Sequence, residues 1–212
     1  RLYGLTTHLY ALRRERDGGI GDFETLAQLC EASAQLGGSL AGINPLHQMF
    51  TDDRTRVSPY QPSDRRFIDP IYIDVSEMGG ESNFDELRAL PHVDYGSVWQ
   101  AKDKLLRAYY EKSKPSKEFE AFIAAGGQAL REHGRFEARH DPSRLRYAMW
   151  LQWIAETQLA AAAKRGKDAG LELGIYRDLA LGCAYEGGEV WAGPKLYSTS
   201  GSIGATPDPL SR

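Results

Sequence analysis

The chain has 212 residues, with 26 Lys and Arg against 29 Asp and Glu, a formal net charge of −3 and 42% hydrophobic residues. This composition is typical of a folded globular protein and excludes a disordered one. The charge excludes the basic footprint of a nucleic-acid-binding domain, and no apolar run reaches the 18 or more residues that a membrane span requires.

The first part of the chain predicts a strand, a helix and a second strand joined by short connections. Residues 3–12 are rich in β-branched and aromatic side chains, which predicts a strand. Asp22 can cap a helix that ends at Gly37-Gly38, and residues 39–46 are a second short apolar strand. The apolar face of the helix consists of Phe23, Leu26, Ala27, Cys30 and Ala34. This β-α-β order predicts parallel strands with a right-handed crossover.

The middle of the chain predicts a long loop, a short strand and a helical region. Residues 47–69 are polar and contain several prolines, and a loop this long is usually functional. Residues 71–75 predict a short strand, and the apolar spacing over 98–110 predicts a helix. A further helix, interrupted or ended near Gly126-Gly127, carries Phe119, Phe122, Ile123 and Leu130.

The last part predicts a long helix and a third strand. Residues 143–167 have strong helical periodicity, with a stop at Gly170, and residues 171–180 are an apolar strand. A Gly- and Pro-rich tail without a convincing helix follows. The order of elements predicts an α/β protein with parallel strands and a mainly helical insertion after the second strand.

The two cysteines, Cys30 and Cys183, are far apart and in apolar surroundings, so we expect two buried free thiols. A disulfide scaffold is excluded at this size. The first residues contain no apolar stretch long enough for a secretory signal. Together these features favour a reducing, cytoplasmic setting.

Several common site motifs fail on spacing. Gly19-Ile20-Gly21 follows a strand and precedes a helix, but the third glycine of a dinucleotide fingerprint would fall at Glu24. We therefore expect a tight turn there that packs the helix close to the sheet. Gly166-Lys167 is followed by Asp168 and forms no phosphate-binding loop. The five histidines are scattered, which disfavours a zinc site, and no G-x-S-x-G elbow is present.

Three polar side chains at predicted strand ends or in the long loop are candidate site residues. Tyr60, in Ser58-Pro59-Tyr60, could stack on a sugar face or pin the loop to the rim. Asp178 ends the third strand, where α/β barrels place their chemistry, although an ion pair with Arg177 or another basic residue is an equal alternative. Asn44 ends the second strand and either orients a loop or touches a ligand.

The tail offers further candidates. Residues 201–208 (GSIGATPD) combine a flexible segment with a rigid one, which indicates a lid or rim loop or else a disordered terminus. Trp191 and Tyr197 are ligand platforms or packing for that loop, with packing favoured.

Seven segments in order along nearly the whole chain resemble the bacterial 4-α-glucanotransferases, known as amylomaltases or disproportionating enzymes (glycoside hydrolase family 77). The segments are HLYALRRERDGGIGDF (8–23), GINPLHQMF (42–50), SPYQPSDRRFIDPIYIDV (58–75), VDYGSVWQAKDKLLRAYY (93–110), LQWIAETQLA (151–160), GIYRDLALG (174–182) and SIGATPDP (202–209).

The resemblance implies a (β/α)8 TIM-type barrel, of which this chain supplies the first three strands. The barrel start would be residues 1–73, the mainly helical insertion 74–142 and the barrel continuation 143–212, with the chain apparently truncated. The implied activity is transfer of α-1,4-glucan segments between maltodextrins by a retaining double displacement. No organic cofactor and no metal is implied.

By position, the resemblance makes Tyr60 the residue that stacks on the sugar at the cleavage site and Asp178 a binding and orienting residue. The remaining implied substrate-binding residues are Ser58, Asn44, Gly204, Pro207 and Asp208. Thr206 stands where the family usually has proline, and Asp17-Gly18-Gly19 replaces the usual Asn-Trp-Gly.

The Arg-Ile-Asp-His-type motif that carries the family's nucleophile is absent, and the later carboxylates Glu186, Glu189 and Asp208 lie in other contexts. The resemblance therefore places the nucleophile and the acid/base beyond Arg212, so that this chain contains no catalytic residue and is inactive alone. We expect the remainder of the barrel, or a partner, to cover its sheet edges.

Two other interpretations stay open. One is a non-catalytic glucan-binding or interaction protein derived from the same barrel. The other is an unrelated nucleotide- or phosphate-binding domain, which is strongly disfavoured because neither the dinucleotide fingerprint nor the phosphate-binding loop has the required spacing. Expected partners are an α-1,4-glucan or maltooligosaccharide and the rest of the barrel, but neither nucleic acid nor a membrane.

Overall fold

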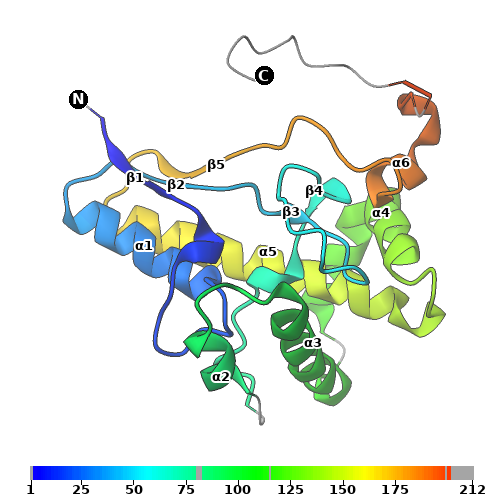
Figure 1. The fold of residues 1–212 in the computed structure, drawn as a ribbon, viewed down its shortest axis with the longest axis horizontal. Helices are drawn as coiled ribbons and strands as arrows, with labels where there is room; N and C mark the ends of the chain where they lie inside the picture. The colour runs from blue at the N-terminus through cyan, green and yellow to red at the C-terminus, as the bar shows by residue number, and fades with distance from the viewer. Residues whose placement is uncertain (1, 80–82, 115, 199, 202–212) are drawn as a thin grey trace.

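The computed structural model describes residues 2–79, 83–114, 116–198 and 200–201. Its central element is a parallel sheet in the order β1-β2-β5 (Figure 1). These strands are β1 (Gly4–Thr7), β2 (Leu40–Ile43) and β5 (Gly174–Arg177). In the register of the sheet, Gly42 of the central strand lies between Thr6 and Tyr176.

Two helices cover one face of this sheet. Figure 1 shows α1 (Phe23–Gln35) and α5 (Leu145–Asp168) running along the same side of the strands, and the two helices pack against each other. Gly166 permits their close approach, because a Cβ there would lie 3.0 Å from the Cβ of Cys30. Ala41 and Ile43 of β2 are buried in the hydrophobic cluster that these helices share.

The order β1, α1, β2, insertion, α5, β5 is that of a partial (β/α)8 TIM-type barrel with three strands. The prediction of an α/β fold with parallel strands and a mainly helical insertion after the second strand is therefore confirmed. On the other side of the sheet Tyr176 is 64% exposed. No helix in the described part of the chain is long and apolar enough to cross a membrane.

The insertion packs onto the far half of α5. It contains α2 (Phe84–Ala89), α3 (Tyr95–Lys112) and α4 (Lys117–Glu137). The predicted interruption of α4 is present at Gly127, whose φ of 54° and ψ of −138° are not helical. Buried residues of α3 and α4, including Leu106 and Leu130, belong to the same hydrophobic cluster as the sheet and α1.

The predicted strand over 3–12 is too long. After β1 the chain turns into the 3₁₀ helix η1 (Leu9–Ala11), because the Leu9 amide donates to Oδ1 of Asn44 at 2.7 Å instead of continuing the ladder. The other two barrel strands are likewise shorter than predicted, although both are in the predicted places.

The stretch 47–69 is not a pure loop. It contains an antiparallel hairpin of β3 (His47–Gln48) and β4 (Asp64–Ile68). Gln152 of α5 holds β4 by accepting from the Ile68 amide at 2.9 Å and donating to the Ile68 carbonyl at 2.8 Å. The side chain of a distant helix thus completes a strand whose own sequence is polar.

The strand predicted at 71–75 is wrong. The chain forms the 3₁₀ helix η2 (Pro70–Tyr72), capped by Asp69, and then an extended stretch that pairs with no strand in the described part of the chain. The buried ammonium of Lys102 satisfies the carbonyls of Ile71 and Ile73, at 2.7 and 2.8 Å, so that no neighbouring strand is needed.

The tail contains helices that were not predicted. These are α6 (Gly188–Ala192) and the 3₁₀ helix η4 (Pro194–Leu196). Another 3₁₀ helix, η3 (Pro142–Arg144), directly precedes α5, at the start of the helix predicted over 143–167. Helix α6 is fixed by packing on α4 rather than by its own pattern, which has two glycines at its start. Both cysteines are free, but only Cys30 is buried, whereas Cys183 is half-buried.

Candidate functional site

The three barrel strands run in the same direction, so their carboxyl ends meet at one edge of the sheet. The Asp178 amide donates to the Ile43 carbonyl at 3.0 Å, which continues the β2–β5 ladder by one residue. Asn44 and Asp178, which follow β2 and β5, therefore lie at the same edge. We call this edge, with the loop that carries Tyr60, the rim.

Tyr60 and Asp178 are brought together at the rim. The Tyr60 hydroxyl donates to Oδ2 of Asp178 at 2.9 Å, although 118 residues separate them. This hydrogen bond is the main cause that raises the pKa of Tyr60. Tyr60 remains 49% exposed. The aromatic ring thus faces solvent beside a carboxylate that accepts hydrogen bonds.

The alternative role of Asp178, an ion pair with Arg177 or another basic residue, does not occur among the ion pairs of the described residues. Besides Tyr60, the Asp178 carboxylate accepts from the Leu179 amide at 2.8 Å. A carboxylate has about four acceptor sites, so Asp178 keeps acceptor capacity that a bound hydroxyl could use.

Asn44 is buried, and its polar atoms are used within the protein. Its Oδ1 accepts from the Leu9 amide, and its Nδ2 donates to the Pro45 carbonyl at 2.8 Å and to the Tyr72 hydroxyl at 3.3 Å. Of its two predicted roles, this geometry favours orientation of the rim over contact with a ligand.

His47 supports the segment after β5 and was not identified from the sequence. Its Nε2 accepts from the Ala180 amide at 3.2 Å, and burial is the main cause that lowers its pKa. The imidazole is therefore neutral near neutral pH and fixes the backbone two residues beyond Asp178. Its position directly after Asn44-Pro45-Leu46, at the end of a strand, was an available signal.

A cluster of Arg65, Glu189 and Tyr197 clamps α6 to β4. Arg65 donates to Glu189 through its backbone amide at 2.8 Å and through its guanidinium, and Tyr197 donates at 2.5 Å. Burial raises the pKa of Glu189, but the hydrogen bonds from Arg65 and Tyr197 outweigh it and lower the pKa to about 2. No sequence signal links these residues, because 124 positions separate Arg65 from Glu189.

The remaining predicted site residues lie partly near the rim, partly in the packing of the helices and partly outside the described residues. Ser58 is exposed, and its carbonyl accepts from the Gln61 amide in the turn that presents Tyr60. Trp191 packs with Phe136 of α4 at a centroid distance of 5.8 Å. Packing of Trp191 against the tail loop stays a prediction, because most of that loop lies outside the described residues. Gly204, Pro207 and Asp208 lie outside the described residues.

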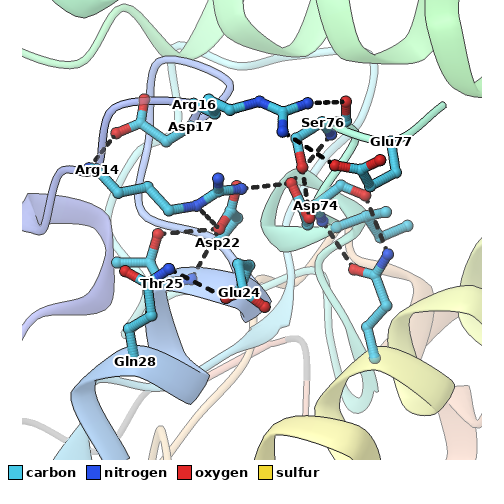
Figure 2. Close-up of polar contacts among 12 residues, drawn as sticks. Arg14, Arg16, Asp17, Asp22, Glu24, Thr25, Gln28, Asp74, Ser76 and Glu77 are labelled. Carbon is cyan, nitrogen blue, oxygen red and sulfur yellow. Dashed lines mark hydrogen bonds and ion pairs between the residues drawn. The ribbon is translucent and has the colours of Figure 1, made fainter. Parts of the chain in front are cut away.

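The connection between β1 and α1 is the expected tight turn. A Cβ at Gly21 would lie 2.0 Å from the Leu9 carbonyl oxygen, and Gly19 has a φ of +87°. Figure 2 shows the polar network beneath this turn, in which Arg14 lies between Asp22 and Asp74. We call this set of Arg14, Asp22 and Asp74, with Lys102 beside it, the buried network.

The buried network is saturated by the protein itself. Asp22 accepts from Arg14 and from the Thr25 amide and hydroxyl, at 3.0 and 2.9 Å, and so caps α1. A Cβ at Gly18 would lie 2.4 Å from the Cε of Lys102, so the Lys102 side chain packs directly against the backbone of this turn. No group of three or more His, Cys, Asp or Glu side chains suited to a metal ion occurs in the described ranges.

The sequence of this chain is similar to those of one known protein family. The sequence matches the family model described as 4-alpha-glucanotransferase (Glyco_hydro_77) in two stretches, residues 7–144 and 137–212. A 4-alpha-glucanotransferase of Haemophilus influenzae is 29% identical over 272 aligned positions, covering 99% of this chain and 39% of the relative. One of Mycobacterium tuberculosis is 27% identical and covers 100% and 36%, respectively. The chain thus spans less than two fifths of these relatives.

Solved structures agree. The crystal structure of amylomaltase from Corynebacterium glutamicum superimposes with a TM-score of 0.81 at 32% identity, over 88% of this chain and 31% of that one. The amylomaltase from Streptococcus agalactiae in complex with acarbose gives a TM-score of 0.73 at 16% identity, over 93% and 47%, which shows the shared fold.

Proposed function

This chain belongs to the 4-alpha-glucanotransferase family, glycoside hydrolase family 77, and from that premise we propose that its rim binds the α-1,4-glucan substrate of a 4-α-glucanotransferase. The single observation that carries the proposal is the hydrogen bond between Tyr60 and Asp178 at the carboxyl edge of the sheet. Catalytic and binding groups of (β/α)8 barrels lie at this edge.

The chemistry of the pair suits a pyranose ring. A sugar has an apolar face of C–H groups, which the exposed ring of Tyr60 can cover, and hydroxyls at its edge, which the free acceptor sites of Asp178 can bind. Asn44 and His47 position the two strand ends that hold this pair. Ser58 belongs to the turn that presents Tyr60, and we retain Gly204, Pro207 and Asp208 as proposed contacts of a rim loop.

The proposed reaction is a retaining double displacement. A carboxylate nucleophile forms a bond to the anomeric carbon while a carboxylic acid protonates the departing glucan oxygen. The acid, now a base, then removes the proton from the 4-hydroxyl of an acceptor glucan, which displaces the nucleophile and restores an α-1,4 bond. The scheme requires neither a metal nor an organic cofactor.

We propose that the nucleophile and the acid/base lie outside these 212 residues, on the remainder of the barrel. Two of the described carboxylates after β5 are engaged within the protein, Glu186 in an ion pair with Arg56 and Glu189 with Arg65. We propose that Asp178 binds the substrate and does not react with it. By this proposal the chain alone binds glucan without transferring it.

We also propose a division of the chain into a barrel start (1–73), a helical insertion (74–142) and a barrel continuation (143–212). We further propose a cytoplasmic role in maltodextrin and glycogen metabolism.

Two measurements test the proposal. Calorimetric titration of the 212-residue chain with maltotetraose should show binding that Asp178→Asn weakens about tenfold, the effect of about 1.4 kcal/mol from a lost charged hydrogen bond. An assay of glucose release from maltotriose should give none. A titration in which no binding phase responds to Asp178→Asn would overturn the rim assignment, and glucose release would overturn the placement of the catalytic carboxylates elsewhere.

A further inference from the structure

A cavity of about 840 Å³ lies between α3, α4 and α5, away from the rim. Five aromatic rings line it together with polar and charged side chains, and these rings are Tyr109, Tyr110, Phe119, Trp150 and Trp153. Small-molecule sites usually have volumes of about 300–1,000 Å³ and a mostly apolar lining. None of the residues named at the rim lines this cavity.

The rings are held in two groups by the packing of three helices. On one side Trp150 contacts Tyr109 and Tyr110, with centroid distances of 6.2 and 5.4 Å. On the other, Phe119 stacks with Trp153 at 5.5 Å and an interplanar angle of 30°. Trp150 and Phe119 are buried, whereas Tyr109 is 43% exposed. The cavity therefore has a rigid aromatic floor and one aromatic wall that is open to solvent.

Charge does not select an ionic ligand at this cavity. Arg146 lies over the Phe119 ring at 5.1 Å and is paired with Glu120, so its charge is already balanced. The other charged lining residues are Glu111, Lys112 and Lys114, which leave an excess of one positive charge. All three are exposed, so solvent and salt screen their charges, and the buried part of the lining, which is aromatic, favours a neutral ligand.

The cavity still offers hydrogen-bond donors. No described residue accepts a hydrogen bond from the hydroxyls of Tyr109 and Tyr110 or from the indole N–H groups of Trp150 and Trp153. A ligand that combines an apolar face with hydroxyl acceptors would use both the ring faces and these donors. A neutral, ring-shaped, polyhydroxylated molecule has this combination, and a pyranose is such a molecule.

We propose that the cavity between α3, α4 and α5 is a second carbohydrate site, which binds a short stretch of α-glucan by stacking on Tyr109 and Trp153. The choice of α-glucan among pyranose chains rests on the proposed function. Because the site is built on the helical insertion and α5, it would hold a long glucan at a distance from the rim and raise the local concentration of chain ends there.

The tryptophans make the site observable. Trp150 and Trp153 line the cavity, whereas the rim pair consists of a tyrosine and an aspartate, so the two sites are separable by fluorescence. Titration of the 212-residue chain with maltoheptaose should give a saturable change in tryptophan emission. Tyr109→Ala should raise the apparent Kd at least tenfold, whereas Asp178→Asn should leave it within twofold.

A matched variant separates binding from folding. Tyr109→Phe keeps the ring and its packing on Trp150 but removes the hydroxyl, so it should bind more tightly than Tyr109→Ala, with a urea midpoint equal to that of the parent chain. An emission change that Asp178→Asn abolishes and Tyr109→Ala leaves intact would overturn this site while supporting the rim. Saturable displacement of 1-anilinonaphthalene-8-sulfonate by fatty acid, with no effect of maltoheptaose, would overturn it in favour of an apolar ligand.

Discussion

The buried network and the rim pair each contain an aspartate that accepts hydrogen bonds, but the protein satisfies the hydrogen-bonding groups of the two places to different extents. Asp22 has no exposed side-chain surface and accepts from Arg14 and Thr25. Tyr60 is half exposed, and Asp178 has acceptor sites left over. Polar side chains whose hydrogen-bonding capacity is used fully within the protein stabilise the fold. Polar side chains at an open edge that keep free hydrogen-bonding capacity are available to a ligand.

The largest expected effect is at Lys102. Its fully buried ammonium donates to the Ile71 and Ile73 carbonyls, and burial is the main cause that lowers its pKa. Lys102→Ala should reduce the free energy of unfolding by about 3–5 kcal/mol, because it leaves a cavity and two unpaired buried carbonyls. Urea denaturation measures the loss. Lys104→Ala, on the exposed side of the same helix, is the control and should change stability by less than about 0.5 kcal/mol.

Asp22→Ala should cost about 2–3 kcal/mol. The change removes the N-cap of α1 and leaves Arg14 with one carboxylate partner fewer in a largely buried place. Asp22→Asn should cost about half as much, since the amide oxygen can still accept from the Thr25 amide. Equal losses in the two variants by thermal and urea unfolding would show that the charge, and not the cap, dominates.

Glu137 sharpens the comparison because its carboxyl group has a buried oxygen and only one of its two oxygens has a hydrogen-bond partner among the described residues. Its Oε2 accepts from the Thr51 hydroxyl at 2.5 Å, and its Oε1 is buried without a partner among the described residues. The carboxyl borders a small cavity with His133 and Arg144, and Arg54, Arg139 and Asp52 also act on it. Burial is the main cause that raises its pKa from 4.5 to about 7.

The raised pKa of Glu137 makes the protein less stable as pH rises. The folded state retains the Glu137 proton more tightly than the unfolded state, so its contribution to stability is present below about pH 4.5 and is lost as pH rises through about 7. Relative to Glu137→Gln, the parent chain should lose about 1–3 kcal/mol between pH 5 and pH 9. Urea denaturation at both pH values checks this. Glu118→Gln, exposed on the same helix, should show no such pH-dependent difference.

The smallest stability effect is expected at the rim. Tyr60→Phe removes a hydroxyl whose only bond in the described structure is to Asp178, at a solvated edge, so it should change the free energy of unfolding by less than about 0.5 kcal/mol. Maltotetraose binding should nevertheless weaken, by less than in Asp178→Asn. A destabilisation comparable to that of Asp22→Ala would break the comparison and make the rim pair a structural contact.

Local chemistry in the sequence determined the elements that position the site. The Asp22 cap, the glycine stops and the helical periodicity predicted α1, α3 and α5 closely, and the strand–helix–strand order predicted the parallel sheet. These features depend on neighbours within a few positions, where capping, turn chemistry and apolar spacing act. The order of the segments also carried the family resemblance.

Tertiary structure decided what depends on distant partners. The stretch 71–75 has a strand-like composition, yet Lys102 satisfies its carbonyls and no strand forms. The hairpin of β3 and β4 depends on Gln152, and the Tyr60–Asp178 pair joins residues 118 positions apart. A buried backbone group must find a hydrogen-bond partner, but the sequence does not specify which distant side chain provides it. Packing of the helices on the sheet therefore made that choice, and with it the geometry of the rim.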